Sequence, residues 1–122
     1  MRALATLILP LLMAAAGSAP ADGTPFTRLT GKDIRAKVIG KVVTDGAHWS
    51  DRFDQGGALI SWSQGRKSAG KWEIRGDELC VTEAAGESAT RYEVWSAGDE
   101  ISLRLQGIET TFTGYLRRYQ GP

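Results

Sequence analysis

The chain has 122 residues, one histidine, one cysteine and a formal net charge of +1. Its balance of 15 basic and 14 acidic residues excludes the basic excess that a broad nucleic-acid footprint or a polybasic membrane patch needs. A single cysteine excludes an internal disulfide framework, so packing must stabilise the fold. The length predicts one domain that is large enough to bury a hydrophobic core.

The first 21 residues have the pattern of a signal peptide. Met1-Arg2 forms a short positive region, residues 3–16 form an apolar run, and Ala19 and Ala21 stand in the A-x-A relation of a cleavage site. The run is shorter than the ~20 residues that span a bilayer. No cysteine comes directly after the run, where a lipid anchor would need one. We expect cleavage near Ala21 and a periplasmic or secreted protein with no stable membrane anchor.

After the cleavage site, residues 22–28 form a polar, flexible lead-in to a domain that we expect to span 29–122. Thr30, with Asp33 three residues later, is close to a capping box. Gly40 is placed to end the helix that this box begins. The pattern predicts a short helix over 31–39, which must dock on an apolar surface because it is too short to be stable alone.

From Lys41 onward the hydrophobic period is two, and turn signals recur every eight to twelve residues, as in an all-β sandwich or barrel. The clearest stretch is GKWEIRGDELC at 70–80, where Gly76-Asp77 suits a two-residue type II′ turn. The register that follows pairs Trp72 with Val81, Ile74 with Leu79, Glu73 with Cys80, and Arg75 with Glu78. Apolar residues then meet on one face only.

Gly98-Asp99 repeats this rule and pairs Val94 with Leu103, Tyr92 with Leu105, and Glu93 with Arg104. Further strands are expected at 41–45, 48–53, 58–63 and 109–118. Within the last of these, Gly114 indicates a bulge or a close backbone approach. Seven or eight antiparallel strands predict a meander that curls into a small lipocalin-like barrel, with the helix plugging it or packing beside it. The alternative is a curved open sheet wrapped on the helix.

The search for catalytic and metal chemistry finds little. His48 could share a metal with Asp45, Asp51 or Asp54, but transition-metal sites usually use several His or Cys ligands. No Ser lies in a nucleophile elbow, and no glycine loop for phosphate is present. We expect no metal, no cofactor and no enzyme.

Cys80 is a poor nucleophile candidate, because the hairpin register sets it opposite Glu73, and a neighbouring carboxylate disfavours the reactive thiolate. We expect this thiol to be either covered and inert or the site of a Cys80-linked dimer. Carboxylates remain as the one catalytic possibility, since two of them could face each other across a cleft as in glycosidases. The candidates for such a pair are Asp51, Asp54, Glu73, Glu83 and Glu93.

Aromatic residues give the two functional hypotheses. If side chains do not fill the barrel, an interior cavity could bind a small ligand, and the expected lining is Trp62, Trp72, Tyr92 and Phe112. An exposed aromatic surface could instead bind a protein, and the expected residues are Trp49 and Trp95. The basic pairs Arg66-Lys67, which we expect in a loop, and Arg117-Arg118 are interpreted as solvated charge.

Three stretches, LTGKDIR, WSDRF and GKWEIRGDELCVT, carry a resemblance that covers about residues 29–82. The chain resembles a group of small secreted proteobacterial proteins of unknown function with the pattern L-T-G-x-E-I-R followed by G-x-W-x-x-x-G-D-x-L-C. In that group a second cysteine often follows the first, and this chain lacks it. The resemblance implies a secreted compartment and a shared fold, and it supplies no activity.

The sequence therefore predicts a secreted, non-catalytic β-barrel protein that binds a small apolar or amphipathic ligand. The alternative is a small interaction or inhibitor module of the cell envelope that uses its aromatic surface. The partner is accordingly a small apolar ligand or an envelope protein.

Overall fold

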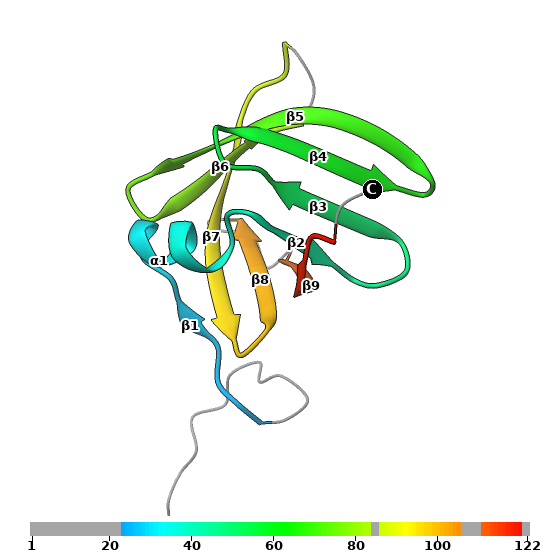
Figure 1. The fold of residues 1–122 in the computed structure, drawn as a ribbon. Helices are drawn as coiled ribbons and strands as arrows, with labels where there is room; N and C mark the ends of the chain where they lie inside the picture. Colours follow the sequence, from blue (N-terminus) through cyan, green and yellow to red (C-terminus); the bar gives the residue numbers. More distant parts are fainter. Residues whose placement is uncertain (1–22, 84–85, 106–110, 121–122) are drawn as a thin grey trace, which may run out of the picture.

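The computed structural model describes residues 23–83, 86–105 and 111–120, which form a short helix and nine strands in one sheet (Figure 1). The expected signal peptide lies outside the described residues, as do residues 109 and 110 of the last expected strand. The elements in chain order are β1 (Thr27–Arg28), α1 (Gly31–Lys37), β2 (Lys41–Thr44), β3 (Trp49–Phe53), β4 (Ala58–Ser63), β5 (Arg66–Arg75), β6 (Glu78–Thr82), β7 (Thr90–Ala97), β8 (Glu100–Leu105) and β9 (Thr111–Arg118).

Strands β2 to β9 form a closed antiparallel barrel. Each strand from β2 to β8 pairs with the next one along the chain, and β9 pairs back onto β2. The predicted eight-stranded meander barrel is confirmed, and the open curved sheet is wrong because the β2–β9 pairing leaves no gap. β1 is an extra strand that pairs with the second half of β7, beyond the residues that β6 covers.

Both predicted hairpins have the expected register. The β5–β6 pairs are those derived from the alternation, and so are the β7–β8 pairs. Gly76 and Gly98 have φ angles of 57° and 58°, whereas Asp77 and Asp99 are not among the residues with positive φ. Positive φ at the first loop position alone is the signature of a type II′ turn.

The β4–β5 connection differs from the prediction. Gln64 and Gly65 both have positive φ, 51° and 79°, as a type I′ turn requires. This turn needs only two residues, so Ser63 pairs with Arg66 and β5 begins there. The expected loop around Arg66-Lys67 is therefore wrong, and both residues belong to a strand.

The helix closes one end of the barrel. Thr30 caps it by accepting a hydrogen bond from the Asp33 N–H at 3.2 Å. It ends at Lys37, two residues earlier than expected, and Gly40 with φ of 85° turns the chain into β2. Ile34 and Val38 are fully buried in the core, which confirms that the helix is docked on an apolar surface.

A close junction fixes the helix against the β5–β6 turn (Figure 1). The Gly31 N–H donates a hydrogen bond to the Asp77 carboxylate at 2.8 Å. A side chain at Gly31 would overlap the Gly76 carbonyl oxygen, so only glycine allows this approach. The T-G of the first motif and the G-D of the second therefore meet in space, and their role at this point is structural.

The core runs from the helix through the barrel. Its largest fully buried side chains include Phe53, Leu59, Leu79 and Ile101. Trp72 is buried at the helix end of the core, where its indole N–H donates to the Asp54 carbonyl at 2.7 Å. Ile34 and Val38 belong to the same core cluster as Trp72.

Candidate functional site

The end of the barrel opposite the helix contains a cavity of about 290 Å³. Strand directions place the β2–β3 and β4–β5 turns at this end, and the helix and the β5–β6 turn at the other. The lining combines four aromatic residues, three further apolar residues, two serines and two carboxylates. In that order they are Trp49, Trp62, Tyr92, Phe112, Phe53, Val81, Leu103, Ser63, Ser68, Asp51 and Glu83.

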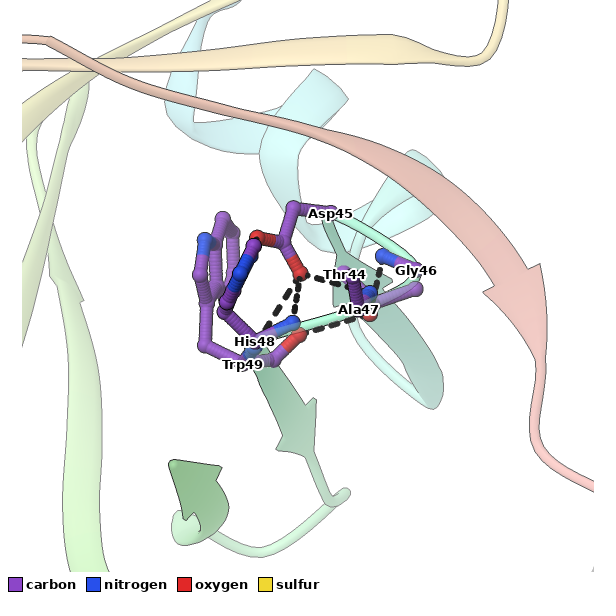
Figure 2. Close-up of polar contacts among 6 residues, drawn as sticks. All are labelled: Thr44, Asp45, Gly46, Ala47, His48 and Trp49. Carbon is purple, nitrogen blue, oxygen red and sulfur yellow. Dashed lines mark hydrogen bonds and ion pairs between the residues drawn. The ribbon is translucent and has the colours of Figure 1, made fainter. Parts of the chain in front are cut away.

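Trp49 is held at this cavity by the β2–β3 turn. The Asp45 carboxylate accepts hydrogen bonds from the backbone N–H groups of Ala47, His48 and Trp49 at 2.7–3.0 Å (Figure 2). The Thr44 hydroxyl donates to the Trp49 carbonyl at 2.6 Å. These bonds fix the backbone from which the indole projects.

Gly114 of β9 makes room for that indole. A Cβ atom built at Gly114 would lie 2.9 Å from Cη2 of Trp49 and 2.9 Å from the Thr44 carbonyl oxygen. Of the two expectations for Gly114, the close approach is the one observed. Trp49 is half-buried and packs against the core, so it lines the cavity rather than forming the exposed surface expected for it.

Tyr92 and Phe112 form the aromatic wall expected of them. Their rings meet edge to face, with centroids 6.2 Å apart and planes at 78°. Tyr92 packs against the core, while Phe112 is 45% exposed at the mouth. The two rings therefore extend from the barrel interior to solvent.

Asp51 and Glu83 bring carboxylates into the same cavity. Asp51 pairs with the fully buried Val43 and with Ser61, so it lies on the inner face of the barrel. Glu83 follows β6 in alternation with Leu79 and Val81, both of which are buried. Asp51 is half-buried, and Glu83 is exposed at the rim.

The electrostatics show that these groups share one environment. Burial raises the pKa of Asp51, a hydrogen bond from the Ser61 hydroxyl opposes this, and the charge of Glu83 raises it further. Desolvation, followed by the charges of Glu83 and Asp51, also raises the pKa of Tyr92. Among the described residues, none of the ion pairs involves Asp51 or Glu83.

Of the four residues expected to line a cavity, three line it and Trp72 does not. Trp72 is part of the core at the helix end and does not reach this cavity. Trp62 borders the cavity, but Arg52 and Lys67 lie over its ring at 5.6 Å and 5.9 Å. In β4, Ser61 and Ser63 face the barrel interior, and Trp62 between them points to the other side of the sheet, so its ring belongs to the outer face.

Trp95 lies on the outer face, where we expected it, but it is not a bare aromatic surface. The Arg104 guanidinium stacks over its ring at 4.4 Å, and Phe26 contacts the same arginine from 5.5 Å. The indole N–H donates to Glu93 at 3.0 Å. The side chain is half-buried by these partners.

The metal alternative at His48 gains no support from the geometry. The imidazole Nδ1 lies 3.0 Å from the Asp45 carboxylate, as a local contact within the turn. The Asp45 carboxylate accepts hydrogen bonds from three backbone N–H groups, and these bonds lower its pKa well below the usual range. Within 23–83, 86–105 and 111–120, no group of three or more potential ligands could hold a metal ion.

Cys80 is buried although it faces away from the barrel interior. It borders a second hollow of about 580 Å³ on the outer side of β5 and β6. Its lining includes Gly56, Gly57 and Gly70 together with Lys71, Glu73 and Thr82. Burial favours the covered thiol over the dimer.

The other candidate carboxylates do not join the cavity. Asp54 forms an ion pair with Arg52 at 2.8 Å, and Glu73 forms one with Arg75 at 3.3 Å. Glu93 bonds Trp95 on the outer face. Only Asp51 and Glu83 of the five are brought together in the cavity. The basic pair Arg117-Arg118 is exposed.

Sequence reasoning missed the pairing of Trp49 with Asp51 in one cavity. The signal was present in WSDRF, because residues 49, 51 and 53 of a strand share a face and Phe53 is apolar.

A comparison with protein-family models, curated proteins and solved structures found no match. In the part of the chain that the structure describes, no helix is both long and apolar enough to cross a membrane.

Proposed function

We propose that this protein is a secreted, non-catalytic β-barrel that binds a small amphipathic ligand in the cavity at its open end. The observation that carries the proposal is the cavity itself, whose lining contains both aromatic rings and carboxylates. Its volume of about 290 Å³ lies at the lower limit of the range typical of ligand pockets, about 300–1,000 Å³. The ligand is therefore small.

The lining supports an amphipathic ligand rather than a purely apolar one. Val81, Leu103 and Phe53 offer apolar contact deep in the cavity, while Asp51, Ser63 and Ser68 offer polar groups. A purely apolar ligand would desolvate these groups without replacing their hydrogen bonds, which is unfavourable. One polar end and one apolar end fit this lining best.

A non-catalytic role is supported by what surrounds the carboxylates. A catalytic acid or base needs a group that orients it and a reacting partner in reach. The Ser61 hydroxyl is the hydrogen-bond partner of Asp51, and the described part of the chain contributes no His, Lys or Cys to the cavity lining. Turnover of any substrate that depended on Asp51 would contradict this part of the proposal.

Native mass spectrometry of protein purified from its own periplasm tests location and binding together. The expected result is a mass that begins at Asp22 plus the mass of a small retained molecule. A mass that keeps the first 21 residues would contradict secretion. A ligand-free protein that also fails to bind any small molecule in solution would contradict the cavity proposal.

Tryptophan fluorescence locates the binding site within the molecule. Because Trp49 lines the cavity with its indole directed inward and Trp95 lies outside it, Trp49→Phe should remove most of a ligand-linked change in emission. Trp95→Phe should leave that change intact. The reverse pattern would favour the alternative, an interaction or inhibitor module of the envelope, as would a protein partner in the native mass spectrum. The partners already stacked on Trp95 count against that alternative.

A further inference from the structure

The charge of the cavity is one-sided. Among the residues that the structure describes, Asp51 and Glu83 are the charged members of its lining, and no Lys, Arg or His belongs to it. Arg66 shares the inward-facing row of β5 with Ser68, but it is exposed at the strand start and does not line the cavity. A half-buried carboxylate with no cation beside it lacks the compensation that buried charges usually have.

The aromatic residues show the same imbalance. Trp72 and Trp95 outside the cavity, and Trp62 at its border, each have an arginine or lysine over the ring within 6 Å. Inside the cavity, no such contact is found for Trp49, Tyr92 or Phe112 among the described residues. Trp49 is the one tryptophan of the chain whose face has no such partner from the described residues.

These two observations are independent, since one concerns carboxylates and the other ring faces, and they point to the same missing partner. A cation is attracted both to a carboxylate and to the face of an aromatic ring. An anionic ligand would meet two like charges in a partly desolvated space, which is costly. A neutral ligand would leave the carboxylates uncompensated.

We propose that the ligand of this cavity is a small organic cation, with an ammonium group between the carboxylates and the aromatic rings and an apolar body against Val81 and Leu103. This inference rests on the proposed function, because it names the chemical class of the ligand for that same cavity. The positive charge of the ligand would compensate the carboxylates and contact the aromatic rings of the cavity, as arginine and lysine side chains contact the rings on the outer face.

Three probes of matched shape test the charge of the ligand: phenethylamine, phenethyl alcohol and phenylacetate, titrated by calorimetry. We expect phenethylamine to bind at least about tenfold more tightly than the alcohol, which corresponds to about 1.4 kcal/mol, and phenylacetate to bind most weakly. Equal or tighter binding of the alcohol or of phenylacetate would overturn the cation inference and leave the proposed function standing. Failure of all three to bind would overturn the cation inference, and native mass spectrometry would then decide the proposed function separately.

Matched variants locate the effect. Asp51→Asn should reduce the affinity for phenethylamine about tenfold and leave that for phenethyl alcohol unchanged. Glu83→Gln should have a smaller effect, because this carboxylate is exposed. Glu87→Gln is the control, since Glu87 is an exposed carboxylate nearby in sequence that does not line the cavity. An equal loss with Glu87→Gln would show long-range attraction only and would overturn the inference, as would binding of calcium ions alone without binding of the amine.

The pH dependence provides a second readout. Asp51 faces Ser61 from β4, Tyr92 from β7 and Glu83 after β6, with Arg66 beyond the rim. An alkyl amine keeps its charge between about pH 5 and about pH 8, so a change in affinity over that range reports the protein. As the pH is lowered, Asp51 becomes protonated and loses the charge that attracts the amine. Since burial raises the pKa of Asp51, this loss of amine affinity should begin at a higher pH than it would for an ordinary carboxylate. Asp51→Asn should remove this early decline, and its persistence would contradict the proposal.

Discussion

The two ends of the barrel have opposite chemistry on the same scaffold. At the helix end, Ile34 and Val38 are completely buried, and the single tryptophan there has its indole N–H bonded. At the open end, the interior keeps two carboxylates and an unfilled volume. A barrel that needed only stability would extend the first arrangement through to the second end. The difference indicates that packing at one end supports a polar cavity at the other.

Loss of packing at the helix end should have the largest effect on stability. Ile34→Ala removes a fully buried side chain and should lower the free energy of unfolding by about 3 kcal/mol, as measured by urea denaturation. The matched change at the open end, Phe112→Ala, removes a ring that is 45% exposed and should cost less than about 1 kcal/mol. Equal costs would mean that both ends carry the stability and would break the comparison.

The junction of helix and hairpin should give the next largest effect. Gly31→Ala forces a Cβ atom against the Gly76 carbonyl and should cost about 2 kcal/mol through overpacking. Gly40→Ala is the control, because its surroundings are open and only its positive φ opposes a side chain, at about 1 kcal/mol. If Gly40→Ala proved the more harmful in thermal unfolding, close approach would not be the constraint at Gly31.

Neutralising the half-buried carboxylate of Asp51 should have a smaller effect on stability, of opposite sign. Because the pKa of Asp51 is raised in the folded state, the folded protein binds more protons than the unfolded chain between the two pKa values. Stability therefore falls as the pH rises from the unfolded value near 3.8 through the folded one. Asp51→Asn should raise stability at neutral pH by about 1 kcal/mol and flatten this decline. Destabilisation by Asp51→Asn at neutral pH would show that the cavity carboxylate supports the fold.

The turn that holds Trp49 should give the smallest effect. The pKa of Asp45 is lowered in the folded state, so its contribution is complete above the unfolded value near 3.8 and is lost as the pH falls below it. Asp45→Ala should lower the melting temperature slightly at neutral pH and have no effect in strong acid. It should also shift Trp49 emission, whereas an unchanged emission would separate this turn from the cavity.

The strands and their registers followed from local rules. Type II′ turns at Gly76 and Gly98 together with strict alternation leave one register that keeps apolar residues on one face, so the β5–β6 pairs and the β7–β8 pairs could be predicted. The helix end was misplaced by two residues, because Val38 is apolar and continues the helical pattern although the helix has already ended there. Boundaries of this kind depend on tertiary contacts more than on propensity.

The cavity was harder to predict than the barrel. In β4 the run Leu59, Ile60 and Trp62 is apolar on both faces, so alternation could not show that Trp62 points outward. Its ring is covered there by Arg52, from the neighbouring strand, a contact that no local pattern reveals. Tyr92 could be placed because the hairpin around Gly98-Asp99 alternates clearly, whereas the meeting of Asp51 with Glu83 depends on closure of the whole barrel.

The hydrogen bond from Gly31 to Asp77 joins residues 46 positions apart, and this has a consequence for the order of folding. A helix of seven residues does not persist in an isolated chain, so α1 can gain structure only after the β5–β6 turn has formed a site for it. Its docking should then come after the rate-limiting step, and changes within it should accelerate unfolding while leaving the folding rate nearly constant. The helix would therefore control how long the folded barrel lasts, and the hairpins how quickly it forms.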